Sequence, residues 1–136
     1  MIIIKSRYEI VHENDFFIGK CGDTAKTSPL LQCAGVFIYS KANQAGILVH
    51  WQDNELKERL KKQLSGLELI NPEAVIAGCG MPIECLLIEE SRTYKEVRDF
   101  LGEERIKVID EKIGFDRKVE LKADFSNGLY KLRYLK

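Results

Sequence analysis

The chain has 136 residues, of which 45% are hydrophobic and 31% are charged. Lysine plus arginine number 21, and aspartate plus glutamate also number 21, so the formal net charge is zero. This composition predicts one globular domain over residues 1–136, long enough to bury a core without disulfides or a structural metal. The neutral charge argues against nucleic acid or an anionic membrane as a partner, because both attract an excess of basic residues.

The N-terminal apolar run covers residues 2–4 and stops at Lys5, far short of a signal-peptide core. No apolar stretch approaches the roughly 20 residues that a membrane-spanning helix needs. We therefore expect a cytoplasmic protein with no membrane partner, and secretion that uses no cleaved signal stays open as a second location.

The first third of the chain predicts short strands. Residues 2–5, 8–11 and 16–19 are apolar enough for strands, whereas residues 22–32 are rich in Gly, Asp, Thr, Ser and Pro and predict a loop. Two almost wholly apolar segments follow, and such runs are typical of strands covered on both faces. They lie at residues 34–39 and 45–49, and the polar stretch between them predicts a hairpin.

Two helices are predicted in the middle of the chain. Residues 54–65 carry a leucine at every fourth position, with Asp53 as N-cap and Gly66 as a stop. The second helix runs from Ser91 or Thr93 to Leu101. Further strands are predicted at residues 74–77, 83–88, 106–109, 118–125 and 129–135, with an Asn-Gly turn joining the last two. Roughly eight strands and two helices predict an α+β fold, a layered sandwich of mixed or antiparallel β-sheet.

Six residues have cysteine or histidine chemistry. Cys21, Cys33, Cys79 and Cys85 show none of the paired spacing that zinc sites use, so we expect free thiols, no metal and no cofactor. Cys33 and His50 lie near the ends of the two strands of the central hairpin. If that hairpin pivots between Lys41 and Ala42, they face each other with Cβ atoms about 4.5–5.5 Å apart.

Such a pair has a defined chemistry. An imidazole beside a thiol favours the thiolate–imidazolium form and lowers the pKa of the thiol. The thiolate attacks an amide carbonyl, and the histidine protonates the leaving nitrogen and then activates water. The pattern also fits a cysteine buried in the core and a histidine at the surface.

The spacing of Thr27, Cys33 and His50 resembles the Thr/Cys/His arrangement of the chemoreceptor glutamine deamidase family (CheD), which is related to the catalytic domain of cytotoxic necrotizing factor toxins. Residues 33–39 are similar to the family's cysteine and the strand after it. Other segments agree with the family's pattern, namely residues 46–50, 74–80 and 114–119.

This resemblance implies a CheD-like fold and a protein glutamine deamidase that acts through a thioester. Cys33 is then the nucleophile and His50 the general acid/base, while Thr27 orients His50 or shapes the substrate pocket. From the residues alone, Thr27 is as well explained as a loop threonine that caps a turn. The partner is a substrate protein with an exposed glutamine, and a regulatory protein partner stays open.

Three further residues are expected to line the substrate pocket: Gln32, Trp51 and Cys79. Trp51 equally fits a core position, and Cys79 a buried thiol between two glycines.

Two alternatives to deamidation remain. Residues 29–32 lack the family's glycines before the cysteine, which favours an inactive protein-binding module on the same fold. Transglutamination, or another thiol amidohydrolase reaction, uses the same nucleophile and base.

Overall fold

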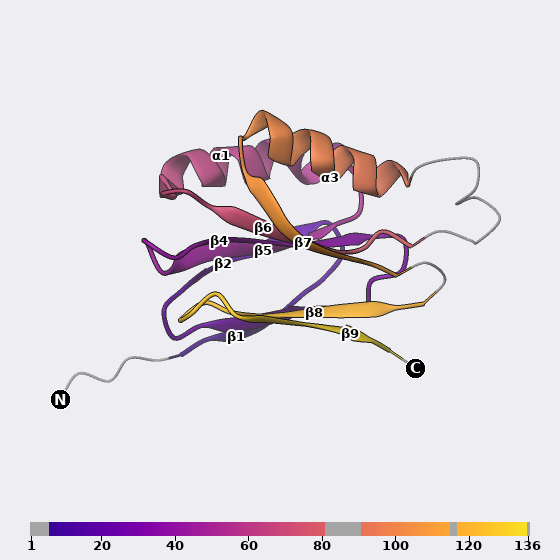
Figure 1. Ribbon diagram of the computed structural model, residues 1–136, viewed down its shortest axis with the longest axis horizontal. Coiled ribbons are helices and arrows are strands. Elements are labelled where there is room, and N and C mark those ends of the chain that lie inside the picture. Colours follow the sequence, from indigo (N-terminus) through magenta and orange to yellow (C-terminus); the bar gives the residue numbers. More distant parts are fainter. Residues whose placement is uncertain (1–5, 81–90, 115–116, 136) are drawn as a thin grey trace.

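The computed structural model describes residues 6–80, 91–114 and 117–135. Its strands form one sheet of five and one of four, and two helices lie on the outer face of the five-stranded sheet (Figure 1). The molecule therefore has three layers, with helices above, the five-stranded sheet in the middle and the four-stranded sheet below (Figure 1). This confirms the predicted α+β layered sandwich.

The five-stranded sheet has the order β2-β5-β4-β6-β7 and contains the central hairpin. Its strands are β2 Asp15–Lys20, β4 Ala34–Ser40, β5 Ala45–Trp51, β6 Glu73–Gly78 and β7 Lys107–Ile113. All pairs are antiparallel except β6 with β7, so the sheet is mixed. Every residue of β4 is buried, as its continuous apolar sequence predicts for a central strand covered on both faces.

The four-stranded sheet has the order β1-β3-β8-β9. Its strands are β1 Tyr8–Val11, β3 Thr24–Thr27, β8 Val119–Asp124 and β9 Tyr130–Tyr134. β1 and β3 are parallel, and the other pairs are antiparallel. In β8 buried residues alternate with more exposed ones, as the sequence pattern predicts for a sheet with one face in the core.

The helices are α1 Lys57–Leu67, preceded by the 3₁₀ turn η1 Asn54–Leu56, and α3 Arg92–Glu103. Asp53 caps η1 by accepting a hydrogen bond from the Glu55 amide, and Ser91 caps α3 by accepting one from the Tyr94 amide. Both caps agree with the sequence prediction. Gly66 lies inside α1 rather than at its end, and Glu68 forms the left-handed C-cap.

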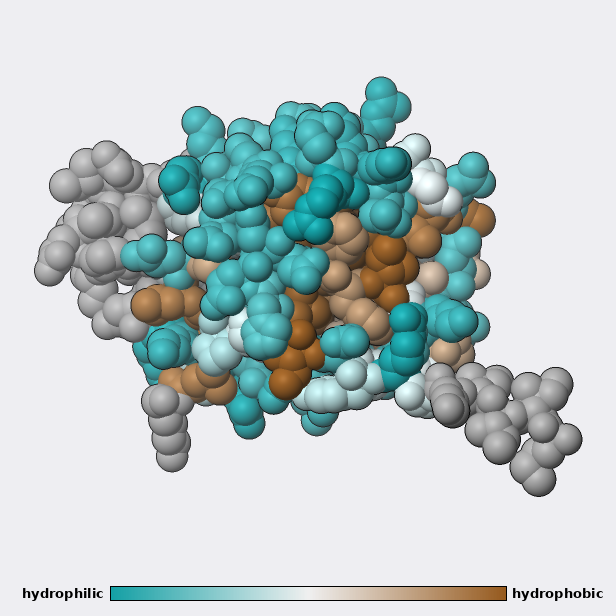
Figure 2. Space-filling view, turned by 180° about the vertical axis from the view of Figure 1, so that it is seen from behind, coloured by the Kyte–Doolittle hydropathy of each residue, from teal (hydrophilic) through white to brown (hydrophobic). Residues whose placement is uncertain are grey.

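The core has two parts, one on each face of the five-stranded sheet. The helix side packs α1 and α3 against alternate residues of β4 and β5, such as Val36 and Val49. The other side fills the space between the sheets with Phe37, Leu48, Phe125 and their neighbours. On the face behind that of Figure 1, hydrophilic residues predominate and hydrophobic ones gather in a central band (Figure 2).

One predicted loop contains a strand. Residues 22–32 include β3, which pairs with β1 on one side and β8 on the other. The local sequence is polar, and the strand is stabilised by its hydrogen-bonded pairing with β1 and β8. The predicted strands at residues 2–5 and 83–88, and Cys85, lie outside the described residues. Among the residues that are described, neither helix has the length and apolar composition that crossing a membrane requires.

Candidate active site

The central hairpin turns one residue later than the position that would set Cys33 opposite His50. Ser40 pairs with Ala45, so residues 41–44 form the turn and Gly35 faces His50. Inside the turn, the Ser40 hydroxyl donates to Asn43 Oδ1 at 2.7 Å, and the Asn43 amide donates back to Ser40 Oγ at 3.3 Å. These bonds stabilise the turn formed by residues 41–44.

The later turn changes the relation between the two candidate residues from opposite to diagonal. It moves the pairing by two positions, which keeps side chains on the same face of the sheet because side chains alternate along a strand. Cys33 packs against the cluster between the sheets, the side on which His50 and Gly35 lie. Diagonal neighbours on a sheet face are typically about 7–8 Å apart, so Cys33 and His50 remain on one face without direct opposition.

His50 is fully buried and firmly held on one side of its ring. Its Nδ1 lies 3.1 Å from the Val11 carbonyl oxygen and 3.1 Å from Ser28 Oγ. Since a carbonyl oxygen can only accept, Nδ1 carries the hydrogen and Ser28 Oγ lies as a second acceptor beside it. The neutral ring therefore has its lone pair on Nε2.

Nε2 of His50 is buried and has no hydrogen-bond partner among the described residues. A buried nitrogen without a partner costs free energy, and such atoms are rare in folded proteins. An imidazole that is held at Nδ1 and left free at Nε2 is the arrangement of a general base. It also follows that no hydrogen bond joins His50 to Cys33 in the described part of the chain.

The environment keeps both groups neutral. Burial lowers the pKa of His50, and the nearby His12 lowers it further, while the bond to Val11 and the charge of Glu13 act in the opposite direction. Burial also raises the pKa of Cys33, with smaller contributions from Glu13 and Asp53. Both directions favour a thiol and a neutral imidazole over the expected thiolate–imidazolium pair.

The backbone around Cys33 is tied to the end of β6. The Cys79 amide donates to the Cys33 carbonyl at 2.9 Å, and the Gly80 amide donates to that of Leu31. Gly78 and Cys79 both have positive φ, 85° and 57°. This backbone turn directs the amides of Cys79 and Gly80 toward the segment before β4. These bonds fix the backbone that carries the candidate nucleophile.

Thr27 makes its side-chain hydrogen bond to β8. It is fully buried at the end of β3, and its Oγ1 accepts a hydrogen bond from the Leu121 amide at 3.2 Å. The hydroxyl at the His50 ring belongs to Ser28, the next residue. Thr27 thus joins β3 to β8, whereas the resemblance implies that it orients His50 or shapes the substrate pocket.

The three predicted pocket residues lie in different places. Gln32 is exposed and directly precedes Cys33. Trp51 points to the opposite face of β5, where its ring packs edge-on against Phe100 and its Nε1 donates to Glu96 at 3.2 Å. The Cys79 side chain also lies in the helix-side core, and burial raises the pKa of its thiol to about 12. The structure therefore places Trp51 and the Cys79 thiol on the face opposite to Cys33, and Gln32 is next to Cys33 in the chain.

Sequence reasoning missed Ser28 and Val11. Both reach His50 because β1 runs parallel to β3, with Val11 paired to Thr27 and the Ser28 amide bonded to the Val11 carbonyl at 3.0 Å. A pairing between segments so far from the hairpin leaves no local signal. In the sequence, the signal that points to Ser28 is its position directly after Thr27.

Comparison of the chain with protein-family models and with curated proteins finds no match. The resemblance to the chemoreceptor glutamine deamidases therefore depends on the residues Thr27, Cys33 and His50 and on the neighbouring segments.

Proposed function

We propose that the protein is a cysteine-dependent amidohydrolase of the protein glutamine deamidase type, in which Cys33 forms a thioester and His50 is the general acid/base. The observation that carries this proposal is the buried Nε2 of His50, which has a free lone pair on the face where Cys33 lies. A purely structural histidine at this depth would be expected to use both ring nitrogens.

The neutral resting state determines how the reaction starts. His50 Nε2 takes the proton from Cys33 Sγ as the sulfur attacks the carboxamide carbon, forming a tetrahedral intermediate. The imidazolium then gives that proton to the leaving nitrogen, the carbon–nitrogen bond breaks, and ammonia departs from a thioester. Water attacks the thioester while Nε2 accepts its proton, the carbon–sulfur bond then breaks, and the imidazolium returns the proton to the sulfur, which leaves the thiol and a new glutamate.

The diagonal placement requires Cys33 and His50 to approach each other during this reaction. Catalytic hydrogen bonds are often long before substrate binds and shorten in the complex. Cys33 is partly buried and lies just before the first residue of β4, with exposed Gln32 as its neighbour. A substrate glutamine that enters beside Gln32 reaches the sulfur before it reaches the buried ring.

The test is ammonia release from a glutamine-rich denatured protein such as casein, with mass spectrometry to locate glutamine converted to glutamate. Wild type and the Cys21→Ala variant should release ammonia, because Cys21 is exposed and distant in sequence from the site. Cys33→Ala and His50→Gln should not. Equal release by wild type and Cys33→Ala would refute the proposal.

Adding methylamine to the same assay separates the related reactions. Incorporation of methylamine into glutamine side chains indicates transglutamination by the same thioester, whereas glutamate formation alone indicates hydrolysis. Both products require Cys33, so the comparison tests the acceptor and not the nucleophile.

The second candidate function is a protein-binding module without catalysis, and the raised pKa of the Cys33 thiol favours it. It predicts that His50 has no effect on Cys33. Iodoacetamide alkylation separates the two, with Cys21 in the same sample as a reference thiol. If His50 assists deprotonation of the thiol, the His50→Gln variant should be alkylated more slowly at Cys33, and its alkylation rate at Cys21 should be unchanged. If the protein is an inactive module, both rates should stay the same.

A further inference from the structure

The turn between β8 and β9 carries an asparagine followed by a glycine. Asn127 is exposed, and Gly128 after it has a φ of 75°. Of the five asparagines in the sequence, Asn127 alone precedes a glycine. The backbone nitrogen of a glycine approaches the side chain of the residue before it with little obstruction, because glycine has no Cβ. The sequence of this turn therefore favours a reaction between the Asn127 carboxamide and the Gly128 amide.

The reaction open to this pair is spontaneous deamidation. The Gly128 nitrogen loses its hydrogen and attacks Asn127 Cγ, the bond from Cγ to Nδ2 breaks, and the leaving nitrogen takes up a proton and departs as ammonia. The product is a cyclic succinimide. Water then adds to either ring carbonyl and breaks its bond to nitrogen, which gives aspartate from the side-chain carbonyl and isoaspartate from the backbone carbonyl.

The folded turn holds both reacting groups by hydrogen bonds. The Gly128 amide donates to the Asp124 carbonyl oxygen at 2.9 Å, and Asn127 Oδ1 accepts from the Leu129 amide at 2.9 Å. Attack on Asn127 begins with loss of the Gly128 amide hydrogen, which is also the step that hydrogen exchange measures. A hydrogen bonded to a carbonyl is released only when that bond opens. The folded turn should therefore slow the deamidation of Asn127.

Further hydrogen bonds keep this turn closed. Asp124 Oδ1 accepts from the Ser126 amide at 2.9 Å. The Tyr39 hydroxyl donates to the Phe125 carbonyl oxygen at 3.0 Å, and Gln44 Nε2 donates to the Ser126 carbonyl oxygen at 3.1 Å. Since Tyr39 lies in β4 and Gln44 in the turn after it, the β8–β9 turn is joined to the central hairpin turn at one end of the sandwich (Figure 1).

We infer that Asn127 is a latent modification site, which converts to aspartate and isoaspartate when the turn opens, and that the bond from the Gly128 amide to Asp124 controls the rate. Isoaspartate adds a methylene to the backbone just before Gly128, where space is short. A Cβ added at Gly128 would lie 2.5 Å from the Tyr39 ring. Conversion should therefore loosen the junction of the two turns, and it adds one negative charge to a chain of zero net charge. The reaction does not depend on Cys33.

The test measures deamidation of Asn127 beside hydrogen exchange of the Gly128 amide. The full chain is incubated at mildly alkaline pH, once folded and once unfolded in urea, and peptide mass spectrometry locates each carboxamide that has become an acid. We expect Asn127 to convert roughly tenfold or more slowly in the folded chain, because only the open turn reacts. Ion-exchange chromatography should separate the product by its added charge.

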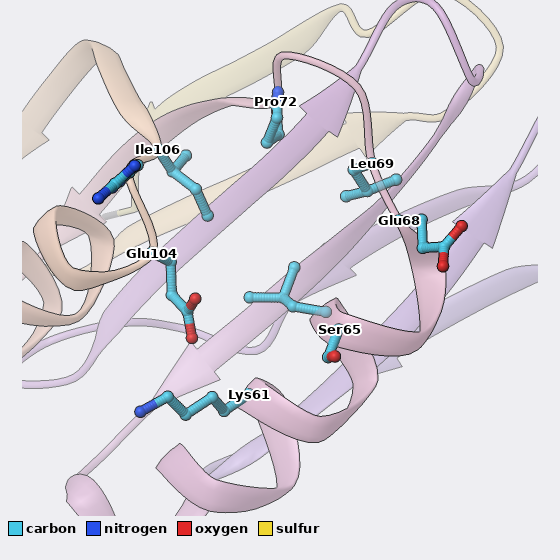
Figure 3. A pocket seen from close by; sticks show the side chains of 9 residues that line it. Lys61, Ser65, Glu68, Leu69, Pro72, Glu104 and Ile106 are labelled. Atoms are coloured by element: carbon cyan, nitrogen blue, oxygen red, sulfur yellow. The ribbon is translucent and has the colours of Figure 1, made fainter.

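Asn71 is a control within the same chain. It is exposed like Asn127 and lies between Leu69 and Pro72, which line a cavity of about 480 Å³ at the ends of α1 and α3 (Figure 3). The nitrogen of Pro72 carries no hydrogen, so it cannot close a ring on Asn71. In urea, Asn71 should convert far more slowly than Asn127.

Two variants connect the rate to the turn. Asp124→Ala removes the acceptor of the Ser126 amide and should accelerate both exchange at Gly128 and deamidation of Asn127 by about fivefold, the factor that one hydrogen bond contributes to local opening. Asp99→Ala removes a carboxylate from an exposed position of α3 and should change neither rate.

Three outcomes overturn the inference. Asn127 deamidates as fast in the folded chain as in urea, or Asn71 converts as fast as Asn127 in urea, or Asp124→Ala, still folded, deamidates at the rate of Asp99→Ala. In the last case the hydrogen bonds of the turn do not control the reaction at Asn127.

Discussion

His50 donates its Nδ1 hydrogen to the Val11 carbonyl oxygen over 3.1 Å, and this bond joins the two sheets of the sandwich. Val11 lies in β1 of the four-stranded sheet and His50 in β5 of the five-stranded sheet. The ring is therefore oriented by the packing of the layers against each other, and its free nitrogen is directed by the fold and not by a flexible loop.

The buried ring should make stability depend on pH. Burial lowers the pKa of His50, so as pH falls below about 6.5 the unfolded state takes up a proton that the native state does not. The free energy of unfolding should therefore fall with pH until the native pKa is reached. Urea unfolding at a series of pH values measures this slope.

Two variants identify the group responsible for that slope. His50→Gln should flatten it between about pH 6.5 and the native pKa, since the titrating group is gone. His12→Gln, which removes the exposed histidine, should retain it. If the slope survives in His50→Gln, another group is responsible, and His50 is not held neutral by burial.

Thr27 and Ser28 should respond differently to loss of their hydroxyl groups. Thr27→Val leaves the buried Leu121 amide without its acceptor and should lower the free energy of unfolding by about 1–3 kcal/mol. Thr27→Ser keeps the hydroxyl and should recover most of that loss. Ser28→Ala should change stability less, yet slow the His50-dependent alkylation of Cys33.

Thermal unfolding and iodoacetamide kinetics on the same three variants give both measurements. The assignment fails if Thr27→Val slows alkylation and leaves stability unchanged, because Thr27 would then act on His50 as the family resemblance suggests. It also fails if Ser28→Ala has no effect on alkylation.

The sequence predicted the parts of the fold whose signal is local. These local signals are the apolar strands of the central hairpin, the leucine repeat of α1 and the caps at Asp53 and Ser91. Each can be recognised from a short stretch of consecutive residues. β3 was missed because its residues are polar and its pairing with β1 and β8 is long-range. Propensity gives no account of a strand that neighbours stabilise from both sides.

The candidate site shows the same division. The spacing predicted that Cys33 and His50 face each other, and the structure has them as diagonal neighbours on one face of the sheet. Their register was displaced because the side chains of Ser40 and Asn43 stabilise a longer turn. The partner of His50 could not be found from the hairpin, since Ser28 and Val11 reach it from the other sheet.

Gly78 should be essential for the backbone at Cys33. Its φ of 85° is strained for any residue with a side chain, and an added Cβ would lie 2.5 Å from the Cys33 carbonyl oxygen. Gly78→Ala should lower the free energy of unfolding by about 1–3 kcal/mol. It should also change the alkylation rate of Cys33, because the bond from the Cys79 amide depends on this turn.

Gly66→Ala is the matched control for that substitution. Gly66 lies inside α1, and nothing lies within 4 Å of an added Cβ. This variant should raise the free energy of unfolding by roughly 0.5–1 kcal/mol, since alanine favours a helix over glycine. Equal effects of the two substitutions on stability or on Cys33 would contradict the role given to Gly78.

Asp23 should protect the fold against acid. Its carboxylate is almost fully buried and accepts from Arg7 Nη2 at 2.8 Å, from the Lys20 amide at 2.9 Å and from the Arg7 amide at 3.1 Å. Burial acts to raise the pKa of Asp23, but these hydrogen bonds and the Arg7 charge outweigh it and lower the pKa overall. The stability that Asp23 contributes is therefore present above about pH 4, the unfolded value, and is lost as pH falls toward the native pKa.

Asp23→Asn should lower the free energy of unfolding at pH 7 by roughly 1–3 kcal/mol, because a charged acceptor of several hydrogen bonds is lost. It should also show less additional destabilisation than wild type as pH falls below about 4. Asp99→Asn, at an exposed position, should retain the wild-type acid profile. Circular dichroism during urea unfolding at neutral and acidic pH measures both effects, and an acid profile of Asp23→Asn that matches wild type would show that Arg7 and Lys20 do not stabilise the ionised form.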